Sequence, residues 1–417
     1  MGEVQRSKRL PVLGQPTRSR SFRPSEVRAR PRPAYAVWEI TLACDQRCVA
    51  CGPRAGRRRS NELTSAEALA LVDALAELGV GEITFIGGEA YLRDDLPQVI
   101  RRAREHGVRA TMTTGGRGLT SRRLEGLVQA GLQQIGYSID GLPETHDALR
   151  SPGSFGRAMD SMAAAKALGV RVTANTQINR RSVDELLPLA ERLAAVGIAG
   201  WQPILTIPHG NAADDPTLIL QPYMLPHAYA VLEAVLDLFD ARGVGVWPGN
   251  NLGYFGPLEH RLRRRQNPSG HYGGCQAGTS IVGIESDGTI KACPTLSRVG
   301  HSPGSVRDAP LRTLWEGGAA LRHAAERTVD DLWGFCRSCY YADACLGGCA
   351  ATSEPLLGRP GNNPYCHHRA LELRRQGLRE RVEPCAPADP APFGHGLFRL
   401  VCEPIPPSFQ DPHETLP

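Results

Sequence analysis

The chain has 417 residues, 41% of them hydrophobic, and a formal net charge of +5, so it is long enough for one large α/β domain and a smaller one. It contains neither the apolar core of a signal peptide nor a run of about 18 apolar residues, which argues against export or membrane insertion and favours the cytoplasm. Twelve cysteines in such a chain are more typical of metal ligands than of a disulfide framework.

The first predicted element is a disordered basic tail, residues 1–33, rich in Arg, Pro and Ser. Because most of the positive excess lies there, we expect neither nucleic acid nor a membrane as a partner. Residues 34–242 then alternate short β-rich runs with longer helical ones, the pattern of βα units around a parallel sheet. The six predicted strands are Tyr35–Thr41, Glu82–Ile86, Arg109–Thr113, Gln134–Ile139, Arg171–Gln177 and Trp201–Leu205.

Two of the intervening helices carry start signals. A capping box of Thr64 and Glu67 opens a helix predicted over Ser65–Leu78, and Ser182 with Glu185 predicts a second capping box. Six βα units are too few to close an eight-stranded barrel, which leaves a partial (β/α)6 TIM-like barrel or an open doubly wound sheet. In either fold, ligands bind in the loops that follow the strands.

The composition changes after residue 242. Residues 243–269 are a predicted linker, and residues 270–381 form a second, cysteine-rich domain. Residues 382–417 are rich in Pro and are predicted to be an extended tail, in which Cys385 and Cys402 have no assigned role.

A first group of cysteines, Cys44, Cys48 and Cys51, lies in the loop after the first strand with the spacing CxxxCxxC. Three thiolates can hold three irons of a four-iron cubane cluster and leave the fourth iron open to another molecule. A structural zinc site would need a fourth Cys or His nearby, and none occurs between Cys51 and His106. A redox CxxC pair, the other alternative, would leave Cys44 unexplained.

This motif, placed after the first strand of a βα repeat, resembles the signature of the radical S-adenosylmethionine (SAM) superfamily. In that family the open iron binds the amino and carboxylate groups of SAM, and one-electron reduction of SAM yields a 5'-deoxyadenosyl radical. Ala50 stands before the third cysteine, where the family usually has an aromatic residue, so the packing of the adenine edge differs here.

The resemblance also implies which residues bind SAM. Gly87, Gly88 and Glu89 resemble the GGE motif that binds the methionine amino group. Ser138, Asp140 and Arg150 resemble the segment that approaches the ribose and the methionine carboxylate, and a guanidinium suits a carboxylate. A capping Asp and a surface Arg are the structural alternative. Further polar candidates at strand ends are Gln177, Asn179 and Gln202.

The second group of cysteines resembles the SPASM extension, named for maturases of subtilosin A, pyrroloquinoline quinone, anaerobic sulfatases and mycofactocin. The resemblance implies an inner auxiliary cluster held by Cys275, Cys293 and Cys349, and an outer one held by Cys336, Cys339, Cys345 and Cys366. The inner cluster then has three obvious ligands. Zinc is the alternative for both sites. Pro294 stands where sulfatase maturases carry an Asp base, which argues against sulfatase maturation.

The SPASM resemblance implies an oxidoreductase-type maturase that installs a crosslink or another oxidative modification on a ribosomally synthesised peptide. The implied partners are a precursor peptide, an external one-electron reductant of the flavodoxin or ferredoxin type, and a separate leader-binding protein, because the N-terminal tail is too short for a winged-helix domain. Two alternatives stay open: an oxidoreductase acting on a small molecule in natural-product assembly, and an iron–sulfur electron-transfer protein. No catalytic acid, base or hydrogen donor is assigned; the substrate-side candidates are His209, Asn250, Asn251, Tyr254 and Tyr341.

Overall fold

The computed structural model describes residues 31–267 and 269–406, so the predicted basic tail lies almost entirely outside the described residues. A ten-stranded sheet forms the centre, in the order β10-β9-β8-β1-β2-β3-β4-β5-β6-β7. Its strands β1 to β7 are parallel. They are β1 (Tyr35–Thr41), β2 (Glu82–Gly87), β3 (Arg109–Thr114), β4 (Gln134–Ser138), β5 (Arg171–Ile178), β6 (Gly200–Leu205) and β7 (Gly245–Val246).

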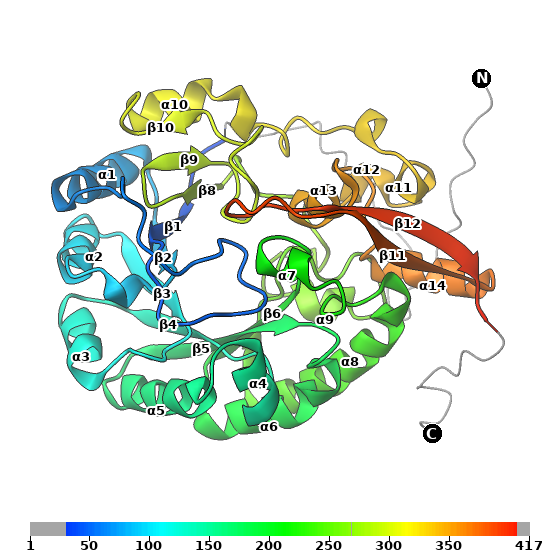
Figure 1. Ribbon diagram of the computed structural model, residues 1–417, viewed down its shortest axis with the longest axis horizontal. Coiled ribbons are helices and arrows are strands. Elements are labelled where there is room, and N and C mark those ends of the chain that lie inside the picture. Colours follow the sequence, from blue (N-terminus) through cyan, green and yellow to red (C-terminus); the bar gives the residue numbers. More distant parts are fainter. Residues whose placement is uncertain (1–30, 268, 407–417) are drawn as a thin grey trace.

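Helices form an arc around the outer face of these strands, which makes the fold the predicted partial barrel (Figure 1). They are α1 (Ser65–Leu78), α2 (Leu96–Glu105), α3 (Ser121–Gln129), α5 (Ser154–Ala167), α6 (Leu186–Val196) and α8 (Leu225–Arg242). The core between the two layers contains fully buried aromatic side chains, among them Trp38, Phe85 and Trp201. The loops after the strands contain the shorter elements η1 (Ala90–Leu92), α4 (Pro143–Leu149) and α7 (Asn211–Asp214).

All six predicted strands are present, with ends within one residue of the prediction. The capping box at α1 is also confirmed: the Glu67 N–H donates to the Thr64 hydroxyl, and the Thr64 N–H donates to the Glu67 carboxylate at 2.8 Å. The second capping box is wrong. Ser182 makes no cap bond, because a 3-10 turn precedes α6 and the Glu185 carboxylate accepts instead from the Leu142 N–H at 2.7 Å.

The cysteine-rich domain continues the barrel sheet. Its strand β8 (Ile281–Ile284) pairs in parallel with β1, and β9 (Thr289–Lys291) and β10 (Gly304–Ser305) extend the sheet in antiparallel fashion. The helices of this part are α9 (Glu259–Arg263), α10 (Leu311–Gly317), α11 (Phe335–Ser338), α12 (Ala342–Cys345), α13 (Ala350–Leu357) and α14 (His367–Arg375). The predicted linker contains β7 and α9.

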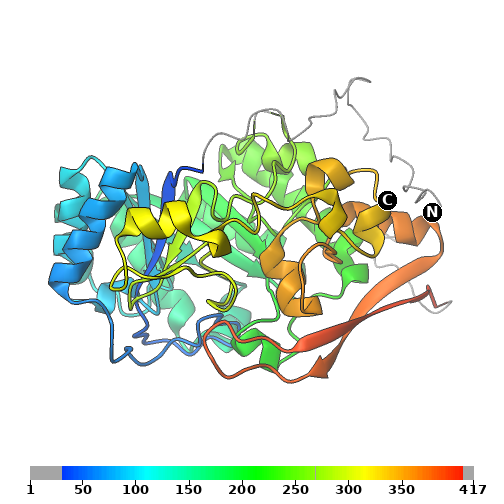
Figure 2. The same cartoon turned by 90° about the horizontal axis from the view of Figure 1, so that it is seen from above.

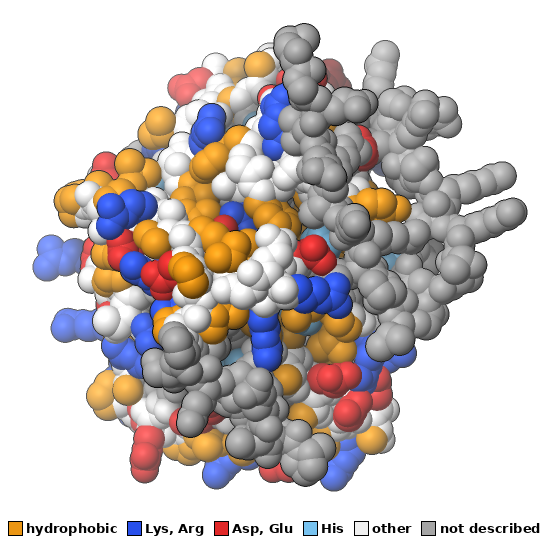
Figure 3. Space-filling model, turned by 90° about the vertical axis from the view of Figure 1, so that its right-hand side faces the viewer, with side chains coloured by type: hydrophobic (Ala, Val, Ile, Leu, Met, Phe, Trp, Pro, Cys, Tyr) orange, Lys and Arg blue, Asp and Glu red, His pale blue; other side chains and the backbone are white. Residues whose placement is uncertain are grey.

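The stretch predicted as an extended Pro-rich tail is a β-hairpin of β11 (Leu378–Ala386) and β12 (Leu397–Pro404). Pro384 and Pro404 are tolerated because each strand of a two-stranded sheet has a free edge. The hairpin runs beside the auxiliary helices, and its turn reaches back toward the barrel (Figure 2). The face that carries it shows apolar side chains near its centre with both signs of charge around them (Figure 3). Among the described residues, no helix is long and apolar enough to cross a bilayer.

Candidate active site

The loop after β1 brings Cys44, Cys48 and Cys51 together, partly buried and without disulfide bonds. Burial raises the pKa of the Cys44 thiol well above its usual range and that of Cys48 to about 12, and the neighbouring thiols add to both shifts. Backbone N–H groups donate to two of the sulfurs, to Cys44 from Gln46 and to Cys51 from Ala55, each at 3.3 Å. Three adjacent thiols in such a place are stable as thiolates only beside a cation, so the loop fits an iron–sulfur cluster.

A second loop, after β6, holds this cysteine loop in place. The Asn211 side chain donates to the Cys48 carbonyl at 2.9 Å, and the Asn211 N–H donates to the Cys51 carbonyl at 3.0 Å. Gly210 has a φ of +58°, and a Cβ there would lie 2.2 Å from the Gly52 carbonyl oxygen, so only glycine fits. The sequence analysis did not single out Gly210 or Asn211. The only sequence feature that could have indicated them is a Gly-Asn pair shortly after a predicted strand.

Gly87 and Gly88 let the end of β2 approach the cysteine loop. A Cβ on Gly87 would lie 2.3 Å from the Thr41 oxygen, and one on Gly88 would lie 2.0 Å from the Ala43 oxygen. The Glu89 N–H then donates to that Ala43 oxygen at 2.7 Å. These glycines therefore set the distance between the second strand end and the cysteines.

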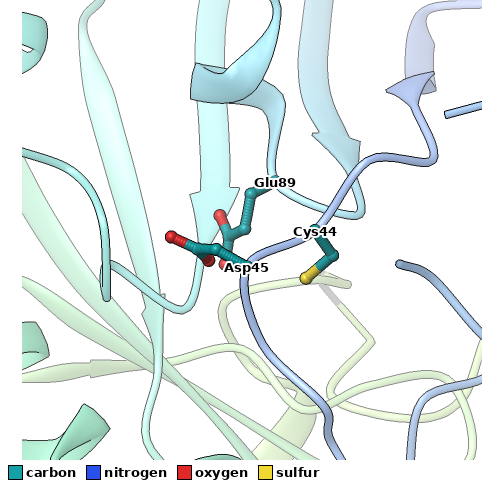
Figure 4. Close-up of side chains that lie close together, drawn as sticks. All are labelled: Cys44, Asp45 and Glu89. Carbon is teal, nitrogen blue, oxygen red and sulfur yellow. The ribbon is translucent and has the colours of Figure 1, made fainter. Parts of the chain in front are cut away.

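The Glu89 carboxylate is buried beside the cysteine loop. It accepts hydrogen bonds from the Thr114 hydroxyl at 2.5 Å, the Gly115 N–H at 2.7 Å and the Gln46 amide at 3.2 Å. Burial raises the pKa of Glu89 to about 7. Figure 4 shows its carboxylate facing that of Asp45, and one ligand atom from each of Cys44, Asp45 and Glu89 lies within 4.8 Å of the others.

A buried ion pair approaches the cysteines from the loops after β4. The Arg150 Nε donates to Asp140 Oδ2 at 2.7 Å, and Arg150 Nη1 lies 3.8 Å from Cys48 Sγ. The other Asp140 oxygen accepts from the Gln177 N–H at 2.8 Å, which ties β4 to β5. Ser138 ends β4 at the same edge. The structural alternative of a surface Arg is wrong, because the Arg150 side chain is only 10% exposed.

The other strand-end candidates are structural or lie outside this cluster. The Asn179 side chain donates to the Gln177 carbonyl at 3.2 Å and accepts from the Arg181 N–H at 2.9 Å, which closes a turn. Gln202 is exposed to solvent in β6.

The second group of cysteines divides into two sets. Four of them line one cavity together with the aromatic side chains of Tyr254, Phe255, Phe335 and Tyr341. These four are Cys336, Cys339, Cys345 and Cys366. Backbone N–H groups of Asn363 and Tyr341 donate to two of these sulfurs, each at 3.4 Å. Four thiols around one cavity fit a fully ligated four-iron cluster.

Cys275, Cys293 and Cys349 form the other set. They come from the turn before β8, the residues after β9 and the start of α13. Burial raises the pKa of Cys275 to about 11 and that of Cys349 to about 12; the Cys293 thiol adds to both shifts, and Cys275 also adds to that of Cys349. This set fits a cluster with three cysteine ligands.

Comparison with known proteins assigns the fold. Residues 38–193 match the radical SAM superfamily, and residues 275–340 match the iron–sulfur cluster-binding domain called SPASM. The chain therefore contains a radical SAM domain and a SPASM domain. It is an enzyme that uses SAM and 4Fe–4S clusters. When bound, these groups supply the reductive cleavage of SAM and the abstraction of hydrogen from a substrate.

Relatives of this radical SAM enzyme span most of its length. Mycofactocin maturase MftC of Mycobacterium tuberculosis is 28% identical over 90% of this chain and 91% of its own. PqqA peptide cyclase of Ruegeria pomeroyi is 29% identical over 84% and 92% of the two chains. An AdoMet-dependent heme synthase of Methanosarcina barkeri is 26% identical over 81% and 97%.

Two solved structures show the same fold. Streptococcus suis SuiB bound to SAM superposes with a TM-score of 0.62 at 17% identity, over 80% of this chain and 76% of its own. The enzyme anSMEcpe with bound AdoMet and the Cp18Cys peptide superposes with a TM-score of 0.64 at 15% identity, over 82% and 95% of the two chains.

The turn of the C-terminal hairpin closes over the cysteine loop of the radical SAM core. The Phe393 N–H donates to the Gly52 carbonyl at 2.9 Å, and the Gly210 N–H donates to the Gly394 carbonyl at 2.7 Å. The Phe393 ring stacks on His209 with 5.7 Å between ring centroids, and the Lys291 ammonium of the SPASM domain lies 4.1 Å from its centre. Sequence reasoning missed this contact entirely.

The substrate-side candidates have unequal positions. His209 lies beside the cysteine loop, its Nδ1 has no partner among the described residues, and burial lowers its pKa to about 4. The Asn251 side chain bonds the backbone of Leu205 in both directions, so its role is structural. Tyr254 and Tyr341 belong to the four-cysteine cavity, and the Asn250 carbonyl accepts from the Tyr254 hydroxyl.

Proposed function

We propose that this enzyme reductively cleaves SAM and abstracts hydrogen from a ribosomally synthesised peptide, installing a crosslink or another oxidative modification. The observation that carries this proposal is the similarity to the maturase MftC over 90% of this chain. A match of that length includes both the radical SAM core and the SPASM domain. The PqqA peptide cyclase, similar over 84% of the chain, supports the same substrate class.

The proposal assigns three clusters. Cys44, Cys48 and Cys51 hold the SAM-binding cluster; Cys275, Cys293 and Cys349 hold an inner auxiliary cluster; Cys336, Cys339, Cys345 and Cys366 hold an outer one. The residues proposed to bind SAM are Gly87, Gly88, Glu89, Ser138, Asp140 and Arg150. Hydrogen abstraction leaves an unpaired electron on the substrate, and an oxidised product forms when that electron leaves. Pairing of β8 with β1 supports the inner cluster as its acceptor, because it ties Cys275 and Cys293 to the strand that precedes Cys44.

The heme synthases favour a second candidate function. The similarity to the Methanosarcina barkeri protein covers 97% of that relative, so oxidation of a tetrapyrrole by this enzyme is the competing hypothesis. The two candidates share the chemistry of the radical SAM core and differ in the substrate from which hydrogen is abstracted.

The proposed partners follow from the peptide function. They are a precursor peptide, an external one-electron reductant of the flavodoxin or ferredoxin type, and a separate protein that binds the leader. Ten clustered cysteines without disulfides favour a reducing compartment, and we place the enzyme in the cytoplasm.

The test uses anaerobically reconstituted enzyme with SAM and dithionite. Two kinds of substrate are tested separately. The first is a set of peptides encoded by short reading frames beside the gene and made with deuterated side chains, and the second is Fe-coproporphyrin III. We expect a peptide product that has lost two hydrogen atoms, at least one of them as deuterium that is recovered in 5'-deoxyadenosine. The Cys44/Cys48/Cys51 triple Ala variant is the control. Turnover of the porphyrin with unmodified peptides would replace the first proposal by the second.

A further inference from the structure

The inner set of cysteines has three members, and the described part of the chain offers no fourth thiol. Four other cysteines line the outer cavity, three follow β1, and Cys385 and Cys402 are exposed on the hairpin. A four-iron cluster held by three cysteines leaves one iron without a protein thiolate. Its fourth ligand must therefore come from another side chain, from solvent or from substrate.

Tyr272 lies beside this set with a hydroxyl group that has no hydrogen-bond partner among the described residues. The residue is 4% exposed. Its ring lies in one buried apolar cluster with Cys349, and Cys293 packs against that cluster. Buried hydroxyl groups are nearly always paired, so an unpaired one packed beside the inner cysteines indicates a missing partner.

One buried carboxylate fixes the position of this ring. Glu259 accepts from the Tyr272 N–H at 2.8 Å with one oxygen and from the Tyr254 N–H at 2.8 Å with the other. The two tyrosine rings pack edge to face, 5.0 Å apart. The guanidinium of Arg263 lies 5.4 Å from the centre of the Tyr272 ring, and its Nε lies 3.8 Å from the Glu259 carboxylate. The phenol oxygen is thus held in one place.

We propose that the phenol oxygen of Tyr272 is the fourth protein ligand of the inner auxiliary cluster, which Cys275, Cys293 and Cys349 hold in the proposed function. During cluster assembly the O–H bond breaks, an Fe–O bond forms, and the proton passes to solvent with no change in oxidation state. A tyrosine oxygen is an established ligand of iron in haem proteins. The positive charge of the iron offsets the cost of a buried phenolate.

Two other buried polar groups lie beside the same cysteines, but neither suits iron as well as the phenol. Arg327 Nη2 belongs to a permanent cation and has no lone pair to offer. The Thr352 hydroxyl, at the start of α13, is buried and hydrogen-bonded to the Cys349 thiol, but an alcohol gives up its proton far less readily than a phenol. Tyr272 is therefore the better ligand.

A fourth protein ligand changes what the inner cluster does. A cluster in which each of the four irons carries a protein ligand does not coordinate substrate, so the inner cluster accepts the substrate electron without a bond to the substrate. This goes beyond the proposed function, because it separates the group that receives the electron from the groups that bind the substrate.

The test uses the Cys44/Cys48/Cys51 triple Ala background, which removes the open iron of the SAM-binding cluster. The probe is ¹³C-labelled cyanide, followed by its hyperfine coupling in the electron paramagnetic resonance spectrum of the reduced clusters. We expect no ¹³C hyperfine coupling while Tyr272 is present and strong coupling in Tyr272→Phe. Both proteins should contain about eight irons per chain, from two four-iron clusters. Thr352→Val, which removes the competing hydroxyl without changing shape, is expected to match the parent.

Three results would overturn the assignment of Tyr272. They are cyanide coupling in the parent, no coupling in Tyr272→Phe with the irons retained, and coupling in Thr352→Val. If Tyr272→Phe loses the inner cluster, the parent protein is measured by resonance Raman spectroscopy instead. Bands of an iron-bound phenolate that shift with ring-deuterated tyrosine support the assignment, and their absence overturns it. A parent with only about four irons would mean that the inner cluster itself is absent, a failure distinguishable by iron content.

Discussion

Arg150 joins the Asp140 carboxylate to the Cys48 sulfur, with 2.7 Å on one side of its guanidinium and 3.8 Å on the other. Both charged side chains are nearly buried. A permanent cation thus lies at the cysteine loop before any cofactor arrives. Its charge favours the thiolate form of Cys48 and an added electron on a cluster bound there.

Replacement of Arg150 should separate structure from cofactor binding. In Arg150→Ala the buried Asp140 loses its partner, and we expect the free energy of unfolding to fall by about 3 kcal/mol. Arg150→Lys keeps the charge but loses the planar fork, so we expect weaker SAM binding with the iron content unchanged. Thermal unfolding and SAM titration monitored by electron paramagnetic resonance measure the two effects. Arg157→Lys, at an exposed position, is the control and should change neither.

Glu89→Gln should abolish SAM cleavage while the clusters remain. The carboxylate accepts from the Thr114 hydroxyl and the Gly115 N–H, and the amide NH₂ group of Gln would face one of these donors. We expect a loss of about 1–3 kcal/mol in the free energy of unfolding from the unpaired buried group. We also expect at least about a 100-fold fall in 5'-deoxyadenosine formation, equivalent to about 2.7 kcal/mol. Retained cleavage in a variant with full iron content would contradict the role of Glu89 in SAM binding.

Phe393→Ala should open the site to solvent. Phe393 is buried at the turn of the hairpin, where its ring stacks on His209 and its N–H donates to the Gly52 carbonyl. Loss of the ring should lower the free energy of unfolding by about 2 kcal/mol. We expect severalfold faster SAM cleavage without substrate and faster cluster loss in air, because water and oxygen reach the cysteine loop. Leu397→Ala, an exposed change on the same hairpin, should behave like the wild type. Equal rates in both variants would show that the turn does not close the site.

The stability of the fold should fall in mild acid because of His146. Its ring is fully buried, its Nδ1 accepts from the Asp140 N–H at 3.2 Å, and burial lowers its pKa to about 4. The unfolded chain binds a proton at this residue below about pH 6.5, whereas the folded chain does not until about pH 4. The stabilisation is therefore complete above pH 6.5 and is lost as the pH falls toward 4, by up to about 3 kcal/mol. Chemical unfolding at a series of pH values should show a flatter profile for His146→Gln; a parallel profile would assign the effect to other groups.

The barrel and the cysteine sets could be predicted because their signals are local. Short buried runs mark the strands, Thr64 and Glu67 cap their own helix, and thiols at fixed spacing have few other uses. The Ser182–Glu185 box failed because the loop at Leu142 competes for the carboxylate, a contact 43 residues away in the chain. The hairpin was not predicted because its high Pro content is typical of an extended tail. Its contact with Gly52 joins residues far apart in the sequence, so no local pattern indicates it.

The register of β8 against β1 has a consequence for how the enzyme assembles. Tyr35 to Trp38 pair with Ile281 to Ile284 on one side and with β2 on the other, so β1 becomes an interior strand only after the SPASM domain has been made. A chain still emerging from the ribosome with only its barrel would present β1 as an unprotected edge, prone to pairing with another copy. Insertion of the first cluster before synthesis is complete would therefore take place on an unfinished sheet, which gives cells a reason to delay cluster delivery until the whole chain is released.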